Sequence, residues 1–146
     1  MILEWCLAIL HVSAFLGLIV FLSGQISLCR TSWWHESIVP RLQRLNAFYW
    51  GSAVTVLVSG LARAVFGVKG WAFYADQPIF WLKLLAFIAV TLMSLRVNRA
   101  YRVWVQHTKI CPPDVDALRR WMMIQAHLIM LFPILGLMMA YGLGLI

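Results

Sequence analysis

The sequence predicts an all-α integral membrane protein: a bundle of four antiparallel transmembrane helices with both termini on the outer side. Of the 146 residues, 63% are hydrophobic and 12% are charged, whereas soluble domains are about half apolar and about a quarter charged. The apolar runs can cross a hydrocarbon core of roughly 30 Å, which takes about 20 residues. The basic residues fall at the ends of these runs, where orientation signals lie.

Four spans form a single domain that covers residues 1–146. They run approximately over residues 3–28, 45–67, 78–100 and 121–143. Their short connections make successive helices antiparallel neighbours in one bundle embedded in the lipid bilayer. No span contains a Gly-Pro pair, and Pro133 stands alone in the last one.

The distribution of Lys and Arg sets the predicted orientation. One side of the membrane receives Arg30, Arg41, Arg44, Arg96, Arg99, Arg102, Lys109, Arg119 and Arg120. Only Arg63 and Lys69 fall near the other side. Because basic residues collect at the cytoplasmic face, both termini are expected outside. The net charge of +7 therefore reflects orientation, and we expect no nucleic-acid partner.

Depth along the helices brings several polar and soft side chains to one level in the outer half. With a rise of about 1.5 Å per residue, Lys83 and Arg63 lie about 6 Å below the outer boundary. His11 and Met138 lie about 10 Å below it, and Tyr141 is one turn above Met138. A lysine inside a membrane span marks a functional site by default, because its charge is costly there.

The charges of this cluster predict a ligand. Two cations and a histidine converge with a single acid, Glu4, which shares a helix face with His11. Buried charges must be paired, so the cluster requires either close use of Glu4 or an anionic ligand. Haem b is the first candidate, since its propionates suit Lys83 and Arg63, and an imidazole or thioether can hold its iron. A quinone is the second, because its carbonyls can accept hydrogen bonds from Lys83 or His11.

Each residue of the cluster also has a structural interpretation. Lys83 and Arg63 have long stems and can extend their charges to the headgroups. His11 can be a buried histidine held by a hydrogen bond to protein. Met138 can be packing material, and Tyr141 can belong to the interfacial aromatic belt.

The last span carries two further features. His127, in its inner half, is a second candidate metal ligand, and a hydrogen bond to a neighbouring helix is the alternative. Gly136, Ala140 and Gly144 recur at four-residue spacing. Such a ladder of small residues serves close helix contact, either inside the bundle or between two copies.

Three motifs carry a resemblance to a known family. They are Gly60-Leu61-Ala62-Arg63 at the end of the second span, the turn Val68-Lys69-Gly70-Trp71, and Phe80-Trp81-Leu82-Lys83 opening the third span. With them the chain resembles a family of small bacterial inner-membrane proteins catalogued as a domain of unknown function, number twenty-two fourteen. The resemblance implies a multi-pass protein of the bacterial cytoplasmic membrane and no particular activity.

His11 and Lys83 carry a more distant resemblance. Their places early in the first and third spans are similar to those of a histidine and a lysine in the HemJ type of protoporphyrinogen oxidase and in CopD-like copper-resistance membrane proteins. The HemJ resemblance implies haem binding and porphyrin oxidation at these positions. The run Ala14-Phe15-Leu16-Gly17 departs from the Trp-Phe-x-Gly run of that type.

Two functions remain open from the sequence. The first is a haem-binding redox protein, with porphyrinogen oxidation and electron transfer to quinone as the implied reaction. The second is a non-catalytic accessory subunit or assembly factor, in a homo-oligomer or a larger membrane complex, which the small size and the ladder favour. A transporter component ranks last, because four helices offer little pathway unless they oligomerise.

Overall fold

The computed structural model describes residues 2–106 and 112–141, which form helices joined by short turns and contain no strand. The helices are α1 (Ile2–Leu28), α2 (Val39–Phe66), α3 (Gly70–Ala75), α4 (Pro78–Gln106), α5 (Pro112–Ile129) and α6 (Leu131–Ala140), and two 3-10 turns, η1 (Thr31–Trp33) and η2 (Glu36–Ile38), join α1 to α2. Counting α5 and α6 as one, four helices in these described residues are long and apolar enough to cross a membrane. The predicted all-α fold with four spans is confirmed.

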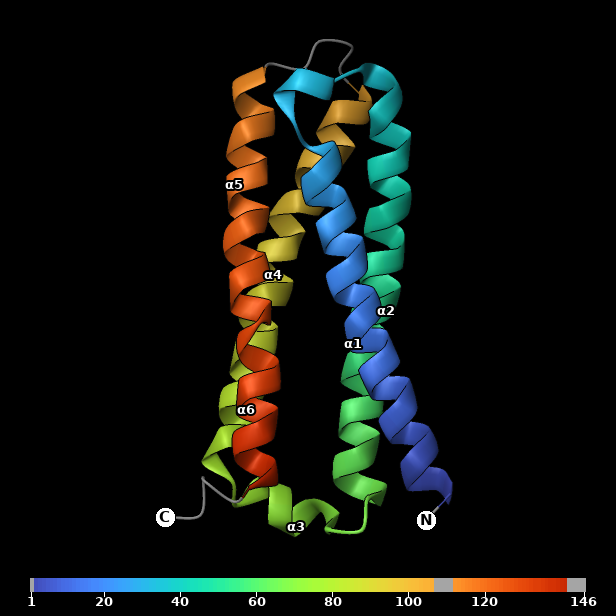
Figure 1. Cartoon of the computed structure of the whole chain (residues 1–146), viewed down its shortest axis with the longest axis vertical. Helices are drawn as coiled ribbons and strands as arrows, with labels where there is room; N and C mark the ends of the chain where they lie inside the picture. Colours follow the sequence, from blue (N-terminus) through green and yellow to red (C-terminus); the bar gives the residue numbers. More distant parts are fainter. Residues whose placement is uncertain (1, 107–111, 142–146) are drawn as a thin grey trace.

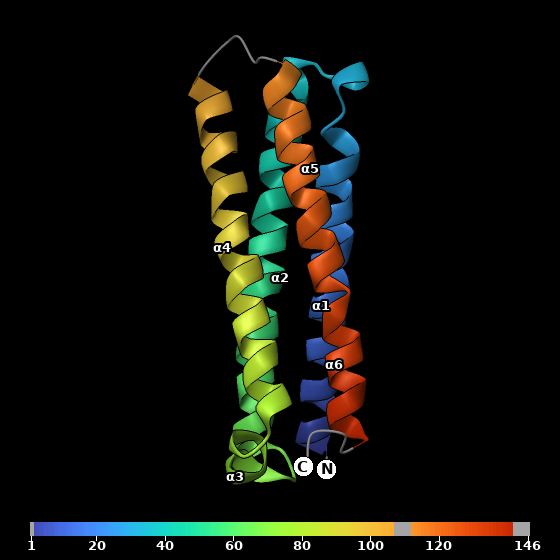
Figure 2. The same cartoon turned by 90° about the vertical axis from the view of Figure 1, so that its left-hand side faces the viewer.

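The long helices form an antiparallel bundle (Figures 1 and 2). α1 packs on α2, α2 on α4, α4 on α5, and α5 on α1. The short helix α3 lies across one end, where α1 begins and α6 ends (Figure 1). We call this the α3 end, and the opposite end, where α2 begins and α4 finishes, the arginine end. The sequence predicts that the α3 end faces outward.

The helices at the arginine end extend beyond the predicted spans. α2 begins at Val39 rather than at Leu45, with a proline in its first turn, where the missing N–H has no partner to lose. α4 continues to Gln106, and α5 begins at Pro112. Arginine is a good helix former, so a helix can continue past the membrane boundary into a basic segment.

The last span is interrupted at one residue, although the sequence showed only a lone proline there. α5 ends at Ile129 and α6 begins at Leu131, with a turn at Met130. Pro133 explains the position of the break, because it has no N–H to donate to the carbonyl four residues earlier, that of Ile129. The connection after α2 also differs from a simple loop, since it contains α3, entered through Gly70 at φ 71°.

Close packing is concentrated in the arginine half of the bundle. The buried residues of α1 are Leu18, Leu22 and Gln25, all in its second half, and α6 contains none. In α4 no residue between Ile79 and Val90 is buried. In Figure 1, α4 and α6 diverge from α1 and α2 toward the α3 end. His11 and Lys83 are only partly buried there, whereas Ser59 and Ala64 of α2 remain buried.

Buried hydrogen bonds reinforce the packed half. The Gln125 amide nitrogen donates to the hydroxyl oxygens of Tyr49 at 2.7 Å and Ser94 at 2.6 Å, joining three helices. Nearer the arginine end, the Tyr101 hydroxyl donates to Gln25 at 3.1 Å. Cys29 lies just beyond α1, and burial raises the pKa of its thiol to about 11, so this thiol is protonated at neutral pH.

Reporter fusions test the predicted orientation of this bundle. Fusions after Arg44 and after Val105 should report cytoplasm, because the arginine end is held inside by its positive charge. Fusions after Lys69 and at the C-terminus should report the outer side. A cytoplasmic C-terminus would contradict the predicted orientation and would move the site described below to the other face.

Candidate functional site

The site at the α3 end is built around His11. This residue lies on α1, and its Nδ1 is 3.0 Å from the hydroxyl oxygen of Ser59 on α2. The imidazole rests on Gly60, where an added Cβ would come within 3.1 Å of the ring carbon Cε1. Ser59 and Gly60 of α2 thus contact the histidine of α1, and the ring is held in one orientation between the two helices.

The hydrogen bonds of Ser59 assign the tautomer of His11. Its hydroxyl faces the carbonyl oxygens of Thr55 at 2.5 Å and Val56 at 3.3 Å. A carbonyl only accepts, so the single hydroxyl proton is used on these oxygens. The Ser59 oxygen must then accept a proton from His11 Nδ1. In the neutral ring with this tautomer, Nε2 has a lone pair, which is the form of imidazole that binds a metal.

Two cations flank the histidine. Arg63 on α2 and Lys83 on α4 both interact electrostatically with the His11 ring, and Arg63 acts on Lys83 in the same way. Within residues 2–106 and 112–141, no carboxylate pairs with either cation. Glu4, the predicted acid, is half-buried at the start of α1. The three residues predicted from depth alone are thus brought together, and the charge of the cations is not balanced by the described acids.

Phenylalanine rings form a floor beneath these polar groups. The ring of Phe132 on α6 lies 6.1 Å from Phe15 on α1 and 6.4 Å from Phe87 on α4, between centroids. Phe15 and Phe87 are each four residues from His11 and Lys83, one turn closer to the arginine end. The floor separates the polar site from the packed half. A planar ligand could stack on its aromatic rings.

The last span reaches the site through a glycine. A Cβ added at Gly136 would lie 3.5 Å from Lys83 Nζ, so α6 approaches the lysine closely there. This contact places the first member of the predicted ladder inside the bundle. Ala140 is exposed, and Gly144 lies outside the described residues.

The remaining predicted site residues are placed less centrally. Met138 is half-buried on α6. Tyr141, at the end of that helix, is 76% exposed, as a belt residue would be. His127 is exposed on α5, and its Nδ1 lies 2.7 Å from the carbonyl oxygen of Met123 in the same helix. The alternative interpretation of His127, a hydrogen bond to a neighbouring helix, is wrong, because its partner is its own helix.

The described part of the chain offers no group of side chains that could hold a metal ion without a cofactor. There, no group of three or more His, Cys, Asp and Glu side chains converges to hold an ion. His11 is the histidine that lies among the clustered cations, and His127 lies apart from them on α5.

The chain matches a known family over nearly its whole length. The model of a family described as "Predicted membrane protein (DUF2214)" matches residues 3–144. The chain belongs to this family. DUF2214 membership confirms the resemblance based on the Gly-Leu-Ala-Arg and Phe-Trp-Leu-Lys motifs, which end in Arg63 and Lys83. No curated protein and no solved structure matches the chain at a significant level. The DUF2214 description agrees with the four spans and assigns no activity, and the HemJ resemblance stays a prediction.

Replacing the glycine under His11 tests the geometry of this site. Gly60→Ala should bring a methyl group within 3.1 Å of the ring, displace the imidazole and weaken its hydrogen bond to Ser59. Gly51→Ala on the same helix is the matched control, because an added Cβ meets nothing within 4 Å there. The control should gain about 0.5–1 kcal/mol in the free energy of unfolding from helix propensity, and Gly60→Ala should gain less or lose stability. Equal gains, measured by unfolding in mixed micelles, would show that His11 does not rest on Gly60.

Proposed function

We propose that this DUF2214 protein binds haem b at the α3 end and acts as a redox protein of the bacterial cytoplasmic membrane. The observation that carries the proposal is the meeting of a metal-competent imidazole, His11, with two cations, Arg63 and Lys83. Each part of this arrangement corresponds to one part of the cofactor. The support comes from charge, from iron coordination and from shape.

Charge supports an anionic ligand. Arg63 and Lys83 lie within spans long and apolar enough for the membrane, where an unpaired charge is costly. Haem carries two propionates, and a guanidinium pairs with a carboxylate through two parallel hydrogen bonds. Lys83 would bind the second propionate as a compact charge. Binding would neutralise both cations, which the described acids leave unpaired.

Iron coordination supports a porphyrin in particular. A porphyrin supplies four nitrogen ligands to its iron, so one imidazole is enough to hold the metal from the protein. His11 would bind through Nε2, while Ser59 accepts the proton of Nδ1 and fixes the plane of the ring. Such a second partner is usual for a metal-binding histidine and raises its basicity as a ligand. When bound, haem would supply one-electron transfer.

Shape supports a flat, largely apolar molecule. Phe15, Phe87 and Phe132 form the floor of the site, and aromatic rings pack well on a porphyrin face. The α3 half also lacks the close packing of the arginine half, although protein interiors are normally filled. A ligand between α1, α4 and α6 would complete the core that these helices leave partly exposed.

Two substitutions at this site should impair haem binding in different ways. His11→Ala should lose haem or change its spin state, because iron loses its nitrogen ligand. Lys83→Met keeps much of the stem and removes the charge, so it should keep the spectrum of a ligated iron but retain haem less well. The readouts are haem content per protein and the reduced-minus-oxidised spectrum, and His35→Ala, at an exposed histidine between the two short turns, is the control.

Ser59→Ala separates the positioning of His11 from its coordination. Loss of a partner that orients a metal ligand typically weakens metal binding by about 10- to 100-fold, so the variant should bind haem weakly with His11 still in place. Ser59→Thr, which keeps the hydroxyl, should restore binding. Identical haem occupancy and spectra in the wild type, His11→Ala and Lys83→Met would eliminate the haem site and favour the non-catalytic role in a membrane complex.

A further inference from the structure

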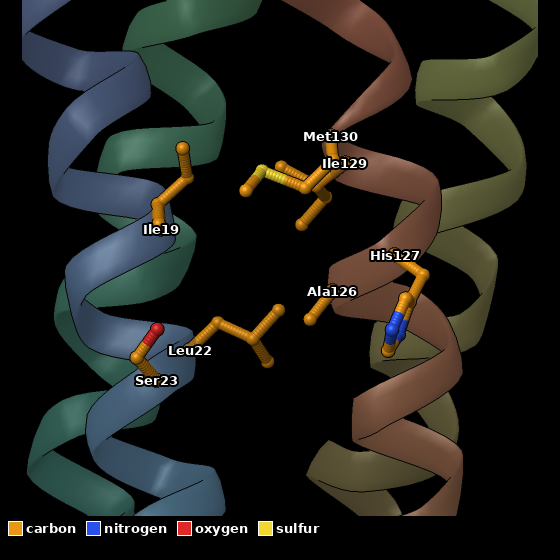
Figure 3. Close-up of a pocket in the computed structure, with 7 residues that line it drawn as sticks. All are labelled: Ile19, Leu22, Ser23, Ala126, His127, Ile129 and Met130. Carbon is orange, nitrogen blue, oxygen red and sulfur yellow. The ribbon is translucent and has the colours of Figure 1, made fainter.

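A cavity and a charged surface lie outside the α3-end site. The cavity, of about 240 Å³, lies between α1 and α5 (Figure 3). Apart from Ser23 and His127 its lining is apolar, so it offers no charge that would select an occupant. The charged surface lies at the arginine end, where α4 and α5 meet and Arg96 covers the ring of Trp121. We call Arg96, Arg99 and Trp121 the arginine–tryptophan cluster.

The indole of Trp121 fixes the position of Arg96. Its Nε1 donates to the carbonyl oxygen of Met93 on α4 at 3.2 Å, so the ring of α5 is held against the backbone of α4. Arg96 follows Met93 by three residues, and its guanidinium carbon lies 4.6 Å from the centre of the indole. A cation is attracted to the face of an indole ring. This contact uses none of the five N–H donors of the guanidinium.

The charge of the cluster is not balanced by protein. Arg99 comes three residues after Arg96, and residues at this spacing are neighbours on a helix surface. Both side chains are exposed, and within the described ranges neither forms an ion pair with a carboxylate. The other arginines of the described chain at this end are Arg30, Arg41, Arg44, Arg102, Arg119 and Arg120. An anion would therefore find free donors in a positive field.

The cluster lies at the level of the lipid headgroups. Relative to the predicted span 78–100, the Cα of Arg96 is about 6 Å inside the boundary at the arginine end, from which its long side chain can reach the headgroups. Trp121 is the first residue of the predicted last span, and tryptophan is enriched at this interface. Toward the α3 end, Leu92 and Ile88 lie one and two turns from Arg96 and are 60% and 46% exposed. An exposed apolar surface thus continues from the cations into the hydrocarbon region.

We propose that the arginine–tryptophan cluster binds an anionic phospholipid of the adjacent leaflet. Arg96 would hold the phosphate through two parallel hydrogen bonds, and Arg99 would add a second cation. One acyl chain would lie along Leu92 and Ile88. Basic sites between membrane helices bind anionic headgroups in this way.

The charges at this end favour a lipid of net negative charge. A zwitterionic headgroup carries its own ammonium group, which the surrounding arginines would repel. A free phosphate ion would make no use of the exposed apolar side chains of α4. The cluster shares no residue with the α3-end site, so this proposal does not depend on haem binding.

Binding of dioleoylphosphatidylglycerol and of dioleoylphosphatidylcholine to the detergent-solubilised protein, measured by native mass spectrometry, tests the proposal. The two lipids have the same chains and differ in net charge, and the wild type should prefer the glycerol lipid. Arg96→Gln should weaken its binding at least about tenfold, because charge-assisted hydrogen bonds are lost. Arg41→Gln removes an equal charge from an exposed position on α2 and is the control. It should weaken binding about fivefold at most.

Substitution of Trp121 separates the built cluster from the overall charge of this end. Trp121→Leu leaves every charge in place and removes the ring that positions Arg96. It should weaken binding of the glycerol lipid about two- to fivefold. Trp121→Phe keeps an aromatic ring under the guanidinium and should retain more of the binding than Trp121→Leu.

Three results would overturn the proposal. Equal affinity of the wild type for the two lipids would show that net charge is not recognised. Equal losses in Arg96→Gln and Arg41→Gln would assign the binding to the diffuse charge of the arginine end. Displacement of the glycerol lipid by inorganic phosphate at matched ionic strength would make the cluster a site for the free ion.

Discussion

Two positive charges in the α3 half of a membrane-spanning bundle constrain the rest of this structure. Arg63 and Lys83 belong to α2 and α4, interact electrostatically with each other and share His11 as a neighbour. Charges placed in a low-dielectric region need a partner of opposite sign, and the described carboxylates do not supply one. Like charges that repel each other are held together here by the packing of their helices. We propose that an anion completes this site.

The two halves of the bundle differ in how closely their helices pack. In the arginine half, apolar packing and the hydrogen bonds among Tyr49, Ser94 and Gln125 join α2, α4 and α5. Hydrogen bonds between membrane helices contribute about 0.6 kcal/mol each on average, so several of them with close packing can stabilise the fold. The α3 half can then remain loosely packed. Proteins commonly keep functional sites less well packed than the rest of the fold, at some loss of stability.

The sequence predicts the spans well because hydropathy and length can be read directly along the chain. Depth along a helix can be read in the same way, so the common level of His11, Arg63 and Lys83 could be estimated from residue counts. Rotation about the helix axis is set by packing against neighbours, which a single sequence does not show. The floor formed by Phe15 and the rings of α4 and α6 was missed for this reason, although the four-residue spacing from His11 was a usable signal.

Other differences arise from local backbone chemistry and from contacts between helices. Pro133 is evident in the sequence, but a lone proline in a membrane span can either kink or break the helix. Only the structure places the interruption at Met130. The direction of Gly136, toward Lys83 instead of toward another copy, depends on how α6 packs. The tautomer of His11 depends on Ser59, whose own hydroxyl proton is committed to carbonyls of α2.

Native mass spectrometry of the wild-type protein, purified in mild detergent, tests most directly whether the cations of the α3 half hold an anionic cofactor. The visible spectrum should be recorded on the same sample. We predict one added mass per chain equal to that of haem b, together with a Soret band and split lower bands on reduction. A colourless sample in which the chain carries no added mass would contradict the proposed site.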